Sequence, residues 1–122
     1  MLRTAVISVA LLGAFIASPA AAEWGAVAVN KNTGHFGWSW GTNDRSKAVS
    51  TAMGYCRSFS KGVDGCELRV RTQKCFAVAY VGKNVFAIEA ASTNAASAKA
   101  MRQCKSKFGS ACTLHGAHCS DE

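Results

Sequence analysis

Cysteine is the residue type in this sequence whose number and spacing first suggest chemistry. The 122-residue chain has six cysteines in two groups of three. A short exported chain with an even number of cysteines predicts three disulfides, and the N-terminus here indicates export. A zinc site is the alternative, but the chain has no Cys-x-x-Cys pair and its spacings do not fit a zinc ribbon or finger. The six residues are Cys56, Cys66, Cys75, Cys104, Cys112 and Cys119.

Other residues with catalytic or metal-binding potential form no catalytic pattern. The chain has no Gly-x-Ser-x-Gly motif and no His-Glu-x-x-His motif, and no carboxylate pair is placed for glycoside hydrolysis. His115, His118 and Cys119 lie close in sequence, but a zinc site there would need a free thiolate at Cys119, which a disulfide removes. We therefore expect no catalytic residue, no metal and no cofactor, and the sequence favours a protein that is not an enzyme.

Basic side chains are the clearest indication of a partner. The chain has a net charge of +7, and a surface of that sign attracts anionic partners at low salt. An ordinary solvated charged face is the alternative. Nucleic acid is not favoured, because few aromatic side chains alternate with the basic residues to stack on bases. The candidate partner-binding residues are Trp24, as an aromatic anchor, with Arg57, Lys61, Arg69, Arg71, Lys105 and Lys107.

Residues 1–22 have the composition of a secretory signal peptide. Arg3 precedes an apolar stretch that ends near Ala17, and three alanines precede Glu23. This pattern predicts cleavage before Glu23, which leaves one domain at 23–122. A membrane anchor is the alternative, but the apolar stretch is shorter than the ~20 residues that span a bilayer. We expect an exported protein in the periplasm or outside the cell that is not an integral membrane protein after cleavage.

The elements that must position these residues form a strand–strand–helix–strand unit in the first half of the domain. Trp24–Asn30 is apolar, and His35–Gly41 alternates large aromatic with small residues, so both are predicted strands that pair as a hairpin. Asn43-Asp44 is a helix N-cap signal, and a helix is expected from Ser46 to Cys56. Cys66–Thr72 is the last predicted strand, with Leu68 and Val70 on the face opposite its charged residues.

The second half repeats this order, which predicts an internal duplication of about 24–75 and 75–119. Cys75–Val81 aligns with the first strand, and Asn84–Glu89 aligns with the second after a shorter hairpin loop. This alignment places Phe86 and Ile88 opposite Trp38 and Trp40. In the helices Ala48, Ala52, Met53 and Cys56 match Ala96, Ala100, Met101 and Cys104. The prediction is one α+β domain in which two units share one core, since neither unit is large enough to bury its apolar face alone.

Trp38 and Trp40 fall on one face of the second predicted strand. They could form an exposed stacking surface for a ligand. The interpretation that we favour is a core position beneath the helix, where the small side chains of Ala48 and Ala52 leave room for two indole rings.

Symmetry between the halves is the guide to disulfide pairing, since six cysteines allow 15 pairings. It suggests Cys56–Cys66 and Cys104–Cys112 as local bonds between a helix end and the next strand, and it leaves Cys75 and Cys119 to link the halves. Loop entropy gives each short bond about 3 kcal/mol and the long one about 4 kcal/mol of stabilisation.

The opening Trp-Gly-Ala-Val-Ala-Val from Trp24, the segment Gly34-His-Phe-Gly-Trp-Ser-Trp and the helix ending in Cys56 together resemble a known group of small exported bacterial proteins, domain of unknown function 4189. The resemblance covers Trp24–Cys119. The second unit departs from the aromatic pattern, because Phe86-Ala87-Ile88 stands where tryptophans would be expected. The resemblance implies export and a disulfide-stapled α+β domain, and it transfers no catalytic residues.

The leading hypothesis is a non-enzymatic exported binding module for an anionic envelope polymer or an acidic protein partner. The alternative is a small hydrolase that acts on the cell envelope, or an inhibitor or effector protein.

Overall fold

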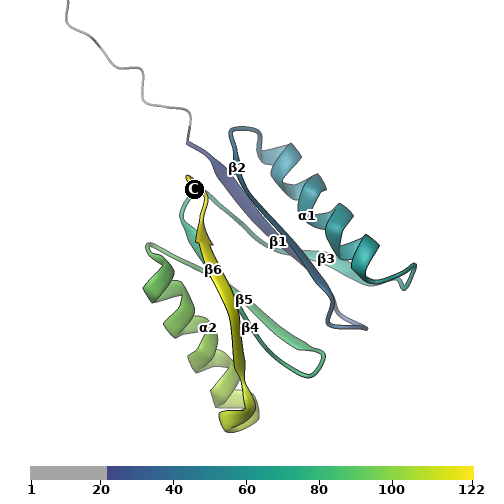
Figure 1. Cartoon of the computed structure of the whole chain (residues 1–122), viewed down its shortest axis with the longest axis vertical. Helices are drawn as coiled ribbons and strands as arrows, with labels where there is room; N and C mark the ends of the chain where they lie inside the picture. Colours follow the sequence, from purple (N-terminus) through teal and green to yellow (C-terminus); the bar gives the residue numbers. More distant parts are fainter. Residues whose placement is uncertain (1–21) are drawn as a thin grey trace, which may run out of the picture.

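Two α/β units of the same topology lie against each other, one from each half of the described chain (Figure 1). The computed structural model describes residues 22–122, so all of the predicted signal peptide except Ala22 lies outside the described residues. No helix within residues 22–122 is long and apolar enough to cross a membrane. The predicted α+β fold, with its strand–strand–helix–strand order occurring twice, is confirmed.

The first unit is a three-stranded antiparallel sheet of order β2-β1-β3 with one helix. Its elements are β1 (Trp24–Asn30), β2 (Phe36–Thr42), α1 (Arg45–Phe59) and β3 (Cys66–Thr72). The N-cap is confirmed, because the Asp44 side chain accepts a hydrogen bond from Lys47 N at 3.2 Å. Helix α1 continues beyond Cys56, where the sequence predicted its end, and Ser60 then caps it by donating its backbone N–H to Cys56 O.

The second unit repeats this arrangement with the sheet order β5-β4-β6. Its elements are β4 (Cys75–Val81), β5 (Asn84–Ala90), α2 (Thr93–Phe108), a short 3-10 turn (Gly109–Ala111) and β6 (Thr113–Cys119). Ser92 is the N-cap of α2, and its hydroxyl oxygen accepts a hydrogen bond from Ala95 N at 3.1 Å.

The helices cover the outer faces of the two sheets, so the layers run helix, sheet, sheet, helix (Figure 1). Each helix packs on its central strand through small side chains, with Ala48 and Ala52 of α1 against Ala26 and Ala28 of β1. Alanine against alanine allows the close approach, and the edge strand β2 presents Gly37 to the helix. A Cβ at Gly37 would overlap the carbonyl oxygen of Ala52.

The inner faces of the sheets form the predicted shared core. The first unit contributes Val27, Val29 and Val70, and the second contributes Phe76, Val78 and Val85. All six side chains are buried, and they come from four strands of the two sheets. Each unit therefore covers the apolar face that the other could not bury alone.

Strand pairing corrects the predicted alignment of the two halves by one residue. Trp38 pairs with Val27, which faces the shared core, whereas Phe86 pairs with Ala79, which faces helix α2. The structural counterpart of Trp38 is Ala87, which pairs with Val78 in the core. The predicted matches of Trp38 with Phe86 and of Trp40 with Ile88 are wrong, because a shift of one residue turns a strand side chain to the other face. Ile88, like Phe86, packs on the helix side.

The predicted core position beneath the helix is wrong for both tryptophans, and Trp40 is exposed. The pairing of β2 shows where Trp38 lies. The side chain lies between the two sheets and not beneath helix α1, which packs instead on the Gly37 and Ser39 side of β2. The Ser39 hydroxyl donates to Ala48 O of the helix at 2.7 Å.

A β-bulge corrects the predicted faces of β3. Val70 pairs with Val27 and Leu68 pairs with Ala28, which leaves Arg69 as an additional residue in β3. The bulge puts Leu68 and Val70 on opposite faces, so their predicted common face is wrong. Strand β6 carries a matching irregularity, since Gly116 and Leu114 pair with consecutive residues of β4.

The structure contains the three suggested disulfides, Cys56–Cys66, Cys75–Cys119 and Cys104–Cys112. Two of them join a helix to the strand region that follows it, as the repeat implied. The expectation that Cys75–Cys119 links the halves is wrong. Both residues belong to the second sheet, where Cys75 of β4 pairs directly with Cys119 of β6.

Candidate functional site

A groove of about 670 Å³ opens where the two units meet near β2 and β6, and we call it the aromatic groove. It is defined by ring side chains from both units and from the loop between β1 and β2. The first unit contributes Phe36, Trp38, Trp40, Tyr55 and Phe59, and the second contributes Tyr80 and His115. His35, Thr33, Gly34 and Gly82 complete it at the two hairpin loops.

Local structure explains why these rings face one space. Phe36 and Trp38 are two residues apart in β2, so both point inward toward the second sheet. Tyr55 and Phe59 are four residues apart on α1, which stacks their rings with centroids 6.2 Å apart. These two side chains are 51% and 53% exposed, so their rings remain available to a ligand.

Two histidines of β6 contact the tryptophans of β2. The Trp38 ring makes edge contacts with His115 and His118 at centroid distances of 4.9 and 4.8 Å. Trp40 stacks on His118 with centroids 3.6 Å apart and planes 11° from parallel. Gly116 lies beneath Trp38, where a Cβ would lie 3.2 Å from Cη2 of the indole. Strand β6 therefore packs against the two tryptophans through its imidazoles, and the small residue Gly116 leaves room for Trp38.

The chain end fixes the position of β6 beside β2. The Ser120 hydroxyl is buried and donates to Thr72 O at 2.8 Å, and Gly41 N donates to Ser120 O at 2.9 Å. His118 Nδ1 lies 2.6 Å from Oε2 of Glu122. This hydrogen bond lowers the pKa of the Glu122 carboxyl below its ordinary value.

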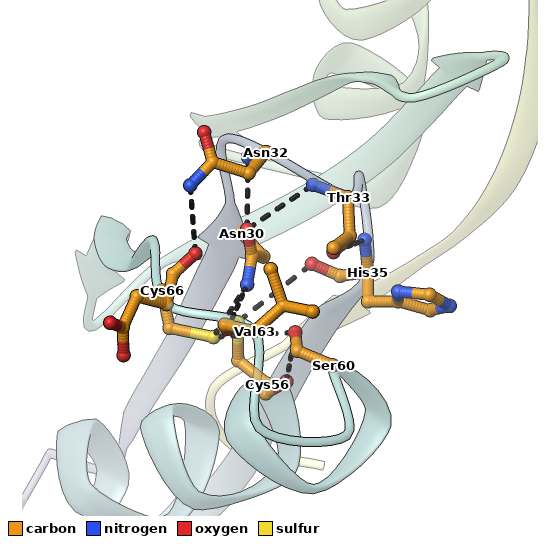
Figure 2. The surroundings of a disulfide bond; sticks show 9 residues. Asn30, Asn32, Thr33, His35, Cys56, Ser60, Val63 and Cys66 are labelled. Carbon is orange, nitrogen blue, oxygen red and sulfur yellow. Dashed lines mark hydrogen bonds between the residues drawn. A yellow bond between two sulfur atoms is a disulfide. The ribbon is translucent and has the colours of Figure 1, made fainter.

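The loop between β1 and β2 is held by hydrogen bonds around the buried side chain of Asn30 (Figure 2). Asn30 Nδ2 donates to Val63 O at 2.8 Å, and Oδ1 accepts from the backbone N–H groups of Asn32 and Thr33 at 2.9 and 3.2 Å. Figure 2 shows the sulfur of Cys66 beside this network, 3.8 Å from Asn30 Nδ2. The first disulfide and Asn30 together hold the loop that closes one end of the aromatic groove.

Three of the six basic residues identified in the sequence line hollows on the surface. Arg69 and Lys107 line a second hollow, of about 380 Å³, together with Lys31 and Lys83. We call this hollow the basic depression. Arg57 lines a different one, beside the loop between α1 and β3.

The remaining predicted partner-binding residues line neither the basic depression nor the hollow beside Arg57. Lys61 follows α1, Arg71 is exposed on β3, and Lys105 is in the last turn of α2. Trp24 is the first residue of β1 and is partly buried, with the Arg45 guanidinium carbon 5.8 Å from its ring centroid.

Sequence reasoning missed Lys31 and Lys83, which occupy the two hairpin loops, and it missed the grouping of rings around the aromatic groove. The alternation in β2 identified the ring face correctly. The partners of that face come from β6, which is distant in sequence, so only the stacking of the sheets reveals them. His115 and His118 were considered as metal ligands, and they contact tryptophan rings instead.

Fold and site together define a small α+β domain with two stacked units, three disulfides, an aromatic groove and a basic depression. A family model described as a domain of unknown function (DUF4189) matches residues 24–119. The chain belongs to this family, which confirms the resemblance seen in the sequence. No curated protein and no solved structure matches the chain.

Proposed function

We propose that this protein is an exported, non-enzymatic binding module that acts in the periplasm or outside the cell and holds an anionic envelope ligand in the basic depression. The observation that carries the proposal is that four cationic residues from both units line one hollow. No carboxylate side chain lines that hollow among the described residues.

The four cations come from four separate elements. Lys31 and Lys83 lie in the two hairpin loops, Arg69 is in β3 at the bulge, and Lys107 is in the last turn of α2. Cations from distant parts of the chain that surround one hollow can contact one anion at the same time, which an ordinary scatter of surface charge does not allow. The units must be stacked for this arrangement to exist.

Arg69 already has a partner, since its guanidinium makes an ion pair with Glu67 at 2.8 Å. Both side chains are exposed, and an exposed ion pair contributes little stability. A multivalent anion in the depression can therefore compete for Arg69. The side-chain amides of Asn84 and Gln103, which also line the hollow, can donate hydrogen bonds to the same ligand.

The proposal of a non-enzymatic role is supported by the bonding of two kinds of nucleophile, the cysteines and Ser120. All six cysteines are in disulfides, so no thiolate is present for nucleophilic catalysis. The buried Ser120 hydroxyl is engaged with backbone carbonyl oxygens and lies away from both hollows.

The test uses the oxidised chain 23–122 and two double variants of equal charge change. Lys83→Gln with Lys107→Gln removes two cations of the depression, and Lys47→Gln with Lys99→Gln removes two exposed helix cations elsewhere. Binding is measured by cosedimentation with vesicles of phosphatidylglycerol, with isolated lipopolysaccharide and with purified sacculi, at low and high salt.

We expect the depression variant to bind at least one of these anionic probes about tenfold more weakly than the helix variant, with a shallower salt dependence. An equal loss of binding in both variants would mean that binding depends only on overall charge, and it would overturn the proposed site. Turnover of a sacculus component by the protein would instead favour the hydrolase alternative.

A further inference from the structure

We propose that the aromatic groove is a second binding site, separate from the basic depression, and that its ligand is an uncharged saccharide. The two hollows share no lining residue, so this inference does not depend on the anionic ligand proposed for the depression.

The exposed rings indicate that the groove is a site and not a packing defect. Trp40, Tyr55 and Phe59 are 36%, 51% and 53% exposed, and all three border the same hollow. Large aromatic side chains gathered on one exposed surface mark interaction sites in small domains. Flat rings in particular offer their faces to the C–H groups of sugar rings.

The charge of the groove selects against an ionic ligand. None of the described residues that line it is a lysine, arginine, aspartate or glutamate. The chain has 14 lysines and arginines, so their absence from the lining of the aromatic groove contrasts with the basic depression. An uncharged ligand is complementary to such a lining, because burying a charge there would leave it unpaired.

Polar groups among the rings favour a saccharide over a hydrocarbon or lipid chain. Thr33, Tyr55 and Tyr80, which carry hydroxyls, and His35 and His115, which carry imidazoles, are among the residues that line the groove. A hydrocarbon ligand would cover these groups without offering partners, at a cost in hydrogen bonding. A sugar offers hydroxyls to them and a C–H face to the rings, and the volume is in the range of ligand-binding pockets.

The walls of the groove are held in place without a ligand. The Asn30 network and the first disulfide hold its hairpin loop. Gly34 in that loop has φ +77° and lies against the backbone of Lys83 in the second hairpin. A preformed site loses little conformational entropy on binding, so it can bind a ligand that makes weak contacts, such as a sugar.

The test is a titration of the oxidised chain 23–122 with neutral trisaccharides built from glucose, galactose, mannose and N-acetylglucosamine, at millimolar concentration. Binding is followed by calorimetry and by the intrinsic tryptophan fluorescence, which Trp24, Trp38 and Trp40 share. We expect at least one trisaccharide to bind with an affinity that salt does not change. Trp40→Ala and Tyr55→Ala should each weaken it about tenfold, and Trp24→Ala should leave it unchanged, since Trp24 lies outside the groove.

Three results would overturn this inference. The first is that the folded chain binds none of the trisaccharides. The second is that Trp24→Ala weakens binding as much as Trp40→Ala does. The third is a concentration-dependent dimer that Trp40→Ala abolishes, because it would assign the groove to a second copy of the chain. Selective binding of an aromatic peptide without any saccharide binding would assign it to a protein partner. The variant Lys83→Gln with Lys107→Gln should keep saccharide binding, so the two sites can fail independently.

Discussion

Strands β2 and β5 occupy equivalent places in the two units, yet they fill the space between the sheets with very different side chains. β2 sends Phe36 and Trp38 inward, whereas the equivalent positions of β5 hold Val85 and Ala87. The larger residue of β5, Phe86, faces helix α2 instead. Strand β2 therefore supplies aromatic bulk at positions where β5 has smaller side chains.

The bulged strands differ in the same sense. The additional residue is Arg69 in β3 and His115 in β6, so equivalent places carry a guanidinium in one unit and an imidazole in the other. Arg69 borders the basic depression, and His115 borders the aromatic groove. A duplicated fold has thus produced two unlike hollows, because residues could diverge at positions where the backbone is the same.

The largest expected effect tests what both units share. We expect excess reductant to unfold the protein, because two bonds of about 3 kcal/mol and one of about 4 kcal/mol rival the ~5–15 kcal/mol stability of a small domain. Circular dichroism with and without reductant measures this, and an unchanged spectrum would contradict it.

The Cys75–Cys119 bond has no counterpart in the first unit. Its removal by alanine substitution should cost about 1 kcal/mol more than removal of Cys104–Cys112.

The next effect tests the unequal filling of the shared core. Trp38→Ala should destabilise the protein by about 3 kcal/mol, because the indole contacts Phe76, His115 and His118 across the sheets and the cavity it leaves cannot close. Urea denaturation gives the free energy of unfolding. Trp24→Ala is the matched control at the start of β1, and a loss there as large as at Trp38 would argue against the asymmetric core.

A smaller effect tests the loops that border the groove. Asn30 ends β1, and its equivalent at the end of β4 is Val81. The variant Asn30→Val therefore makes the two units alike at this position. It should cost about 2 kcal/mol, because Val63 O and two backbone N–H groups lose their partner. The exchange Val81→Asn should change stability little, since Val81 is only partly buried. Hydrogen exchange should accelerate at Asn32 and Thr33 in the first variant, and unchanged exchange there would contradict the role of Asn30.

The smallest effect tests the hydrogen bond between Glu122 and His118, whose ring stacks on Trp40 of β2. The hydrogen bond from His118 lowers the pKa of Glu122, so its contribution to stability is present above the ordinary pKa of glutamate and is lost as pH falls through the lowered value. Melting temperatures of the wild type and Glu122→Gln should therefore differ slightly near neutral pH and converge in acid. Asp121→Asn is the neighbouring control, and a gap that widens in acid would contradict the assignment.

Much of the fold could be predicted because it depends on neighbours in sequence. The N-cap at Asp44, the alanine stripes of both helices and the alternation of β2 are short-range patterns, and each gave the observed element. The three disulfide pairs followed from the repeat of these elements. Of the basic residues expected at a binding surface, Arg69 and Lys107 line the depression, and their grouping with Lys31 and Lys83 depends on contacts between distant parts of the chain.

The sequence by itself determined that Phe36 and Trp38 share a strand face, that helix α1 begins after Asp44, and which cysteines can pair. The tertiary structure alone decided which face looks inward, because a period of two residues leaves that choice to strand register. Pairing of the outer strands with β1 and β4, including the bulges, sets this register. Stacking of the two sheets then placed Trp38 and Trp40 beside His118, although these residues are far apart along the chain.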